Sequence, residues 1–215
     1  MTENIQHIQR KDVVIAGSVG LVSGSTGVLI VRGLGFALNY RLSFAMPAVS
    51  APLFVLVIYL GQVFSRRWRF LNSFTRFGVI GFCNASVDFG ILNILVSSTG
   101  VTRGVYFSLY KTIAFVAALI NSYFWNRAWT FKVKQEKSAG EAVRFVLVIL
   151  GSLLINVGVS SLIVNLVPPP FGLTNRLWLN IASVIAVCFG LFWNFIGMKI
   201  FVFNQEERAM LEEAL

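Results

Sequence analysis

Apolar residues are gathered into six long runs that are separated by short polar segments. The runs cover residues 13–31, 43–63, 76–98, 104–126, 144–167 and 178–203. Each is about 20 residues or longer, the length of helix that crosses a hydrocarbon core of about 30 Å. The pattern therefore predicts an all-α fold: a polytopic membrane protein with six transmembrane helices.

The composition agrees with a membrane protein. Of the 215 residues, 56% are hydrophobic and only 13% are charged, whereas a soluble fold needs far more charge on its surface. The net charge of +9 would suggest nucleic acid as the partner of a soluble protein. Here the cations flank the apolar runs instead of forming one patch, so orientation in the membrane and anionic headgroups explain them better.

Basic residues are concentrated in alternate loops and at both ends of the chain, including the segments 66–76 and 127–144. The opposite side of the membrane holds only Arg32, Arg41, Arg103 and Arg176. Loops rich in Lys and Arg stay in the cytoplasm. Both termini are therefore predicted to be cytoplasmic, and the first run, which no convincing small-residue cleavage site follows, is expected to be a retained helix.

Small residues and prolines predict local features of these helices. Gly20 and Gly24 have the spacing that lets two membrane helices approach closely. Pro47 and Pro52 are expected to kink the second helix, and the prolines at 168–170 to end the fifth.

An internal repeat is visible when the chain is shifted against itself by 72 residues. The shift places Asn84 on Asn156 and Asn93 on Asn165, and polar residues in membrane helices are rare. A weaker match, at a shift of 61 residues, relates the first two helices to the next two. We therefore predict three two-helix hairpin repeats in parallel orientation.

Two charged residues, Asp88 and Lys111, lie within apolar runs. A carboxylate at the middle of a bilayer costs about 2.5–3.5 kcal/mol on insertion scales, so Asp88 is expected to face protein or a wet cavity. The two side chains reach similar heights if the third and fourth helices form an antiparallel hairpin. Two interpretations stay open: a buried ion pair that fixes the hairpin, or an ionisable site along a polar path.

Seven asparagines are distributed over the last four runs, and a group of arginines lies at their cytoplasmic ends. Amides in membrane helices usually bond one helix to another, yet they both donate and accept and so also suit a sugar. The arginines, Arg76 and Arg127 among them, anchor the orientation, and a planar guanidinium also suits a phosphate. The asparagines are Asn84, Asn93, Asn121, Asn156, Asn165, Asn180 and Asn194.

The sequence contains no nucleophile–base pair, metal-ligand cluster, Walker motif or redox motif. The one histidine, His7, lies in the polar N-terminal tail, and Cys83 and Cys188 lie in apolar runs, where a thiol is normally a small packing residue. We therefore expect a protein that is not an enzyme and that has no metal, cofactor or disulfide.

Several of these residues stand in patterns that resemble the GtrA-like family of small four-helix membrane proteins. The resemblance covers residues 74–203. It implies a four-helix domain over that range, with an extra hairpin at 1–73 before it and a cytoplasmic acidic tail at 204–215. The patterns are Arg76-Phe-Gly-Val-Ile-Gly81 with Asn84 and Asp88, Lys111-Thr-Ile-Ala114, Asn126-Arg-Ala-Trp-Thr-Phe131, and Asn194 with Lys199-Ile-Phe-Val-Phe203.

The resemblance implies a flippase of polyprenyl-phosphate-linked sugars in the bacterial cytoplasmic membrane, beside a glycosyltransferase of cell-surface polysaccharide synthesis. Two alternatives stay open: a non-transporting anchor subunit for that glycosyltransferase, and a small-solute or proton-coupled exporter that uses Asp88 as its proton site. A homo-oligomer is possible in each case. The residues expected to bind the sugar and the phosphate are Asp88, Lys111, Asn84, Asn121, Asn126, Arg127, Asn156, Asn194 and Arg76.

Overall fold

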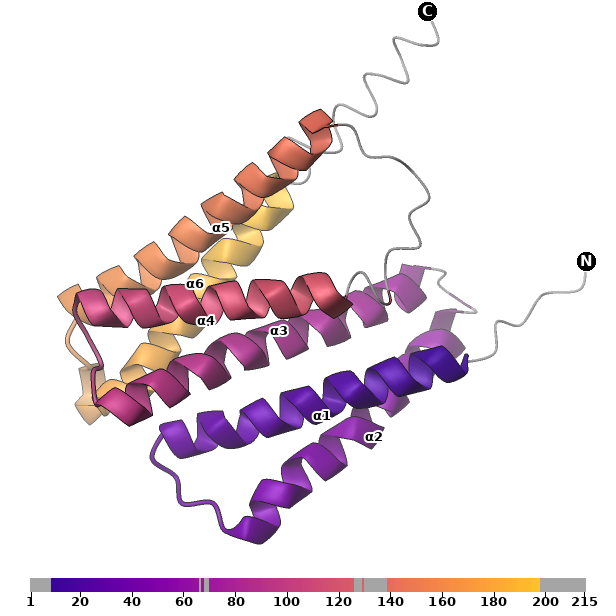
Figure 1. Ribbon diagram of the computed structural model, residues 1–215, viewed down its shortest axis with the longest axis horizontal. Helices are drawn as coiled ribbons and strands as arrows, with labels where there is room; N and C mark the ends of the chain where they lie inside the picture. Colours follow the sequence, from indigo (N-terminus) through magenta and orange to yellow (C-terminus); the bar gives the residue numbers. More distant parts are fainter. Residues whose placement is uncertain (1–8, 66, 68–69, 126–128, 130–138, 198–215) are drawn as a thin grey trace, which may run out of the picture. The chain divides into compact units, whose positions relative to one another are not determined.

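The computed structural model describes residues 9–65, 67, 70–125, 129 and 139–197, and its regular elements in that part are all helical (Figure 1). Six of the helices are long and apolar enough to cross a membrane. The predicted six-helix, all-α membrane fold is therefore confirmed, whereas the hairpin repeats and the cytoplasmic termini stay predictions. The elements are α1 (Arg10–Gly33), α2 (Tyr40–Ser65), α3 (Phe70–Thr99), α4 (Val105–Trp125), α5 (Ala139–Leu166), the short 3-10 turn η2 (Pro170–Gly172) and α6 (Asn175–Gly197).

The chain divides into two compact units, and each is described by itself. Unit 1 comprises residues 1–100 and 113–132 and so contains α1, α2, α3 and the C-terminal part of α4. Unit 2 comprises residues 101–112 and 133–215, with the start of α4, then α5, η2 and α6. The predicted boundary between residues 73 and 74 stays a prediction, and the tail at 204–215 lies outside the described residues.

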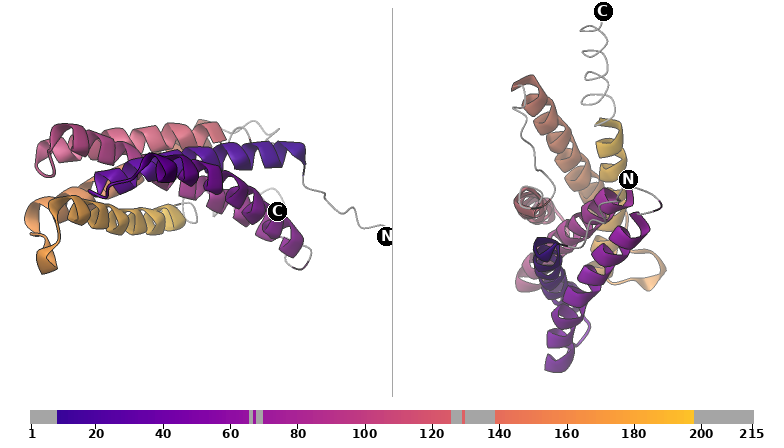
Figure 2. Two further views of the ribbon diagram at one scale, coloured as in Figure 1. Left: turned by 90° about the horizontal axis from the view of Figure 1, so that it is seen from below. Right: turned by 90° about the vertical axis from the view of Figure 1, so that its right-hand side faces the viewer.

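In unit 1, α1 lies antiparallel beside α2 (Figure 1, Figure 2). A Cβ atom on Gly20 would lie 2.6 Å from the carbonyl oxygen of Ser50, and one on Gly24 would lie 2.5 Å from the Cα of Pro47. The Ser50 hydroxyl donates a hydrogen bond of 2.6 Å to the carbonyl oxygen of Gly20. The predicted close approach of the helices at these two glycines is confirmed. The two prolines that were expected to kink the second helix, Pro47 and Pro52, both lie inside α2.

The core of unit 1 joins α1 to α2, α3 and α4. Thr26 of α1 also donates a hydrogen bond of 2.9 Å to the hydroxyl of Ser86 on α3. The hairpin of α1 and α2, which lies outside the GtrA-like resemblance, is thus packed on the first helix inside it. The buried core residues are Ile15, Ala16, Val19, Ile58, Val79, Ile80, Cys83, Val87, Ala118 and Trp129.

In unit 2, two indoles join α6 to α5 near opposite ends of the pair. Trp178 donates a hydrogen bond of 2.9 Å to the carbonyl oxygen of Val167, and Trp193 donates one of 3.0 Å to that of Val148. The two helices are therefore antiparallel. As predicted from the prolines at 168–170, α5 ends at Leu166.

Replacement of Gly24 by alanine tests the contact between α1 and α2. We expect Gly24→Ala to lower the free energy of unfolding by about 1–3 kcal/mol, because the added methyl group overfills a tight interface. Gly78→Ala is the matched control, since nothing lies within 4 Å of a Cβ at Gly78. Unfolding by SDS in mixed micelles, followed by circular dichroism, measures both, and a Gly24→Ala variant as stable as the control would contradict the close approach.

Candidate functional site

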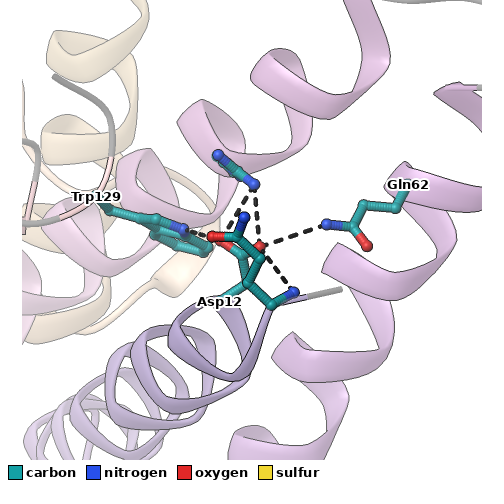
Figure 3. Close-up of polar contacts among 5 residues, drawn as sticks. Asp12, Gln62 and Trp129 are labelled. Carbon is teal, nitrogen blue, oxygen red and sulfur yellow. Dashed lines mark hydrogen bonds and ion pairs between the residues drawn. The ribbon is translucent and has the colours of Figure 1, made fainter. Parts of the chain in front are cut away.

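A buried carboxylate collects hydrogen-bond donors at one end of unit 1 (Figure 3). Asp12 is only 4% exposed, and its Oδ1 accepts a hydrogen bond of 2.8 Å from the indole of Trp129. Arg76 Nη2 lies 3.1 Å from the same carboxylate. The amide of Gln62 and the backbone N–H of Gln9 each donate at 3.4 Å. We call Asp12, Gln62, Arg76 and Trp129 the Asp12 cluster.

Local structure explains why these residues meet. Asp12 is the third residue of α1, where a carboxylate caps the backbone N–H groups and is favoured by the helix dipole. Gln62 belongs to the last turn of α2, Arg76 to the early part of α3, and Trp129 follows α4. Successive antiparallel helices bring these ends to the same side of unit 1.

Arg76 is held by two different interactions. Besides its ion pair with Asp12, its guanidinium carbon lies 5.8 Å from the centre of the Trp129 ring, a distance at which a cation and an aromatic face attract each other. Its side chain is 25% exposed, and its buried Nε has no hydrogen-bond partner. The predicted phosphate ligand Arg76 is thus already paired with a carboxylate that the sequence analysis did not select.

A second polar group joins α3 to α4 within unit 1. Asn121 donates a hydrogen bond of 2.7 Å to the side-chain oxygen of Asn84 and accepts one of 3.0 Å from the indole of Trp125. Its amide nitrogen also lies 3.6 Å from the sulfur of Cys83. The structure therefore brings together two predicted site residues, Asn84 and Asn121. A hydrogen bond between two amides is common where membrane helices pack, and by itself it does not indicate a binding site.

Unit 2 contains a row of buried polar residues on one face of α5. Ser152, Asn156 and Ser160 are spaced four residues apart, which places them on the same side of the helix. The hydroxyl of Ser160 donates to the backbone oxygen of Asn156 at 2.7 Å, and on α6 the hydroxyl of Ser183 donates to that of Leu179 at 2.8 Å. Both hydroxyls are thus satisfied within their own helices.

The side-chain oxygen of Asn156 differs from these groups, because it is buried and has no hydrogen-bond partner. The whole residue is 4% exposed. A buried acceptor left unpaired costs about 1–3 kcal/mol, so such an atom in a folded protein calls for an explanation. Asn156 is the predicted site residue for which unit 2 leaves an acceptor open to a donor from a ligand.

The other predicted site residues are placed as follows. Asp88 is buried in α3 of unit 1 and Lys111 in α4 within unit 2. Neither is without a partner, and the pairing of the two stays a prediction. Asn126, Arg127 and the side chain of Asn194 lie outside the described residues.

Three further asparagines of the predicted polar groove have local partners. Asn165 accepts a hydrogen bond of 2.5 Å from the backbone N–H of Gly104, which ties the start of α4 to the end of α5. Asn93 and Asn180 each donate at 2.8 Å to a carbonyl oxygen of their own helix. These three amides are therefore partly used by the fold itself.

The described cysteines, Cys83 and Cys188, are both free thiols. No three His, Cys, Asp or Glu side chains of the described residues lie together as metal ligands would.

Six apolar helices that carry buried amides and charges define a multi-pass helical membrane protein. The model of the family described as "GtrA/DPMS, transmembrane domain" matches residues 76–203, and the chain belongs to this family. The chain is also similar to the "Uncharacterized membrane protein YngA" of Bacillus subtilis (strain 168). The two are 29% identical over 144 residues, which are 66% of this chain and 87% of that protein. No solved structure matches the chain.

The hydrogen bond between Asn84 and Asn121 can be tested by a double-mutant cycle with leucine. We expect a coupling energy of about 0.6 kcal/mol, and at most about 1.7 kcal/mol, as for other hydrogen bonds between membrane helices. Asn93→Leu with Asn121→Leu is the control pair. Asn93 is nine residues from Asn84 on the same helix, about 13 Å away. The changes in unfolding free energy caused by Asn93→Leu and Asn121→Leu should therefore be additive. SDS unfolding measures each variant, and a coupling no larger than in the control would contradict the bond.

Proposed function

We propose that the protein is a flippase that moves a polyprenyl-phosphate-linked sugar across the bacterial cytoplasmic membrane for cell-surface glycosylation. Its membership of the GtrA/DPMS transmembrane-domain family supports this proposal. The observation that carries it is the unpartnered, buried side-chain oxygen of Asn156 within that family region.

The physical task of such a protein is to carry hydroxyl groups through hydrocarbon. Each unsatisfied polar group costs several kcal/mol in an apolar medium, and an acceptor such as the Asn156 oxygen lowers this cost by accepting a bond from a sugar hydroxyl. The amides of Asn84 and Asn121 contribute further donors and acceptors when they exchange their mutual bond for bonds to the sugar. The amides therefore replace water for the headgroup on its way across.

The two ends of the substrate need different surroundings. Arg76, with Arg127, is proposed to bind the phosphate at the cytoplasmic surface, and Asp88 and Lys111 to serve the polar path inside the membrane. The polyprenyl chain stays in the lipid, against apolar side chains of α5 that are exposed, such as Leu154, Leu162 and Leu166. We propose consumption of the sugar on the outer side as the driving force, and a glycosyltransferase that makes the lipid-linked sugar as the partner.

Transport can be measured with the purified protein in liposomes that contain a labelled polyprenyl-phosphate sugar. We expect wild-type protein to expose the sugar at the opposite face much faster than empty liposomes do. Asn156→Leu should be about tenfold slower, the effect of one lost hydrogen bond of about 1–1.5 kcal/mol. The variant should be at least as stable as the wild type, because leucine removes the unpaired, buried oxygen of Asn156 and places an apolar side chain there.

Ser183→Ala is the matched control, since it removes a buried hydroxyl of unit 2 that is already bonded to its own helix. It should transport at the wild-type rate. Equal rates for Asn156→Leu and wild type would remove Asn156 from the path. Folded wild-type protein that does not accelerate transport would contradict the flippase and favour a non-transporting anchor subunit of the glycosyltransferase.

A further inference from the structure

The Asp12 cluster joins two parts of the chain with different relationships to the family. Arg76 and Trp129 lie within residues 76–203, the range that the family model matches. Asp12 and Gln62 belong to the hairpin of α1 and α2, which precedes that range. The hairpin thus places a carboxylate on a cation and an indole of the family region.

The donors around this carboxylate are those of an anion site. A guanidinium, an indole N–H, a side-chain amide and a backbone N–H all point at the oxygens of Asp12. The guanidinium and the indole, which belong to the family region, are donors of the kind that bind phosphate in proteins, where hydrogen bonds between ionised partners are the stronger ones. The side-chain amide and the backbone N–H belong to the segment before that region and hold the carboxylate in place. Asp12 therefore occupies a place that a phosphate can also occupy.

The carboxylate of Asp12 leaves one hydrogen-bond donor of Arg76 unused. Both of its oxygens are contacted by the same nitrogen, Nη2, while the buried Nε has no partner. Guanidinium groups bind most strongly when two of their nitrogens contact two oxygens. A phosphate, with more oxygens than a carboxylate, can engage Nε and Nη2 together and so compete with Asp12.

The surroundings suit the phosphate of a lipid. The Arg76 side chain is a quarter exposed, and on α1 the residues next to Asp12 along the chain, Arg10, Lys11, Val14 and Ile15, line an open part of the surface. Two cations beside two apolar side chains match a charged headgroup that is attached to a hydrocarbon chain.

We propose that Asp12 is a built-in competitor for the substrate's phosphate, so that the lipid must displace this carboxylate from Arg76 and Trp129 in order to bind. The inference rests on the proposed function and adds its regulation: the amino-terminal hairpin sets how tightly the family region holds the phosphate.

The test is equilibrium binding of radiolabelled farnesyl phosphate to the full chain in detergent micelles. Asp12→Asn keeps the shape of the side chain and removes its charge. It should bind farnesyl phosphate about tenfold more tightly, because the neutral amide competes less strongly than the carboxylate for Arg76. Glu3→Gln removes the same charge nine residues earlier and should leave the affinity unchanged. Arg76→Gln should bind weakly with either Asp12 or Asn at position 12.

A second variant covers the case in which Asp12→Asn does not fold. Gln62→Leu removes one hydrogen bond to the carboxylate and leaves Arg76 and Trp129 intact, so it should tighten binding severalfold. Unchanged or weaker binding in the folded variants would overturn the proposal and leave a static ion pair. Inorganic phosphate, measured beside farnesyl phosphate, should bind far more weakly, and equal affinity would overturn the lipid as the source of the phosphate.

The same measurements separate this inference from the proposed function. Wild-type protein that accelerates transport while Asp12→Asn binds no more tightly would overturn the competitor alone. Absence of both transport and farnesyl phosphate binding in the wild type and in every folded variant would overturn the two together.

Discussion

The bilayer core contains no water, so each polar group within it must find its partner in the protein. Unit 1 meets this constraint through contacts between helices. Asn84 is bonded to Asn121, and the carboxylate of Asp12 is surrounded by donors from three other segments. The bonds to Asp12 require that α1 and α2 lie close together, and the contact of the two helices at Gly20 and Gly24 provides that closeness. In this unit the packing of the helices and the pairing of the buried polar groups thus depend on each other.

Among the buried side-chain atoms of the described residues that have no hydrogen-bond partner, two belong to predicted ligands of the substrate inside the family region. They are the side-chain oxygen of Asn156 and the Nε of Arg76. One is an acceptor among apolar helices, which suits a hydroxyl. The other is a cationic donor near one end of a membrane helix, which suits a phosphate. Each atom, taken by itself, suits one part of a lipid-linked sugar, the class of substrate that we propose.

The six helices could be predicted from the sequence because the length of an apolar run and the thickness of a bilayer leave little freedom. Their partners could not. Arg76 and Asp12 are 64 residues apart, and periodicity does not say which helices touch. The internal repeat was also an incomplete guide: it aligns Asn84 with Asn156, but the position that matches Asn121 is Trp193, whose indole bonds to the backbone of Val148. Equivalent asparagines consequently have different surroundings, and only that of Asn156 leaves an acceptor open.

The path of the sugar is tested most directly by photo-crosslinking. A polyprenyl-phosphate sugar that carries a diazirine on the sugar would be illuminated during transport in proteoliposomes, and the modified residues of α5 identified by mass spectrometry. Because Ser152, Asn156 and Ser160 are buried on one face while Leu154 and Leu162 are exposed, a single helix contains both the test and its control. Cross-links at the three buried positions are the predicted result. Cross-links confined to the two exposed leucines would show that the sugar does not pass Asn156, and would contradict the proposed path.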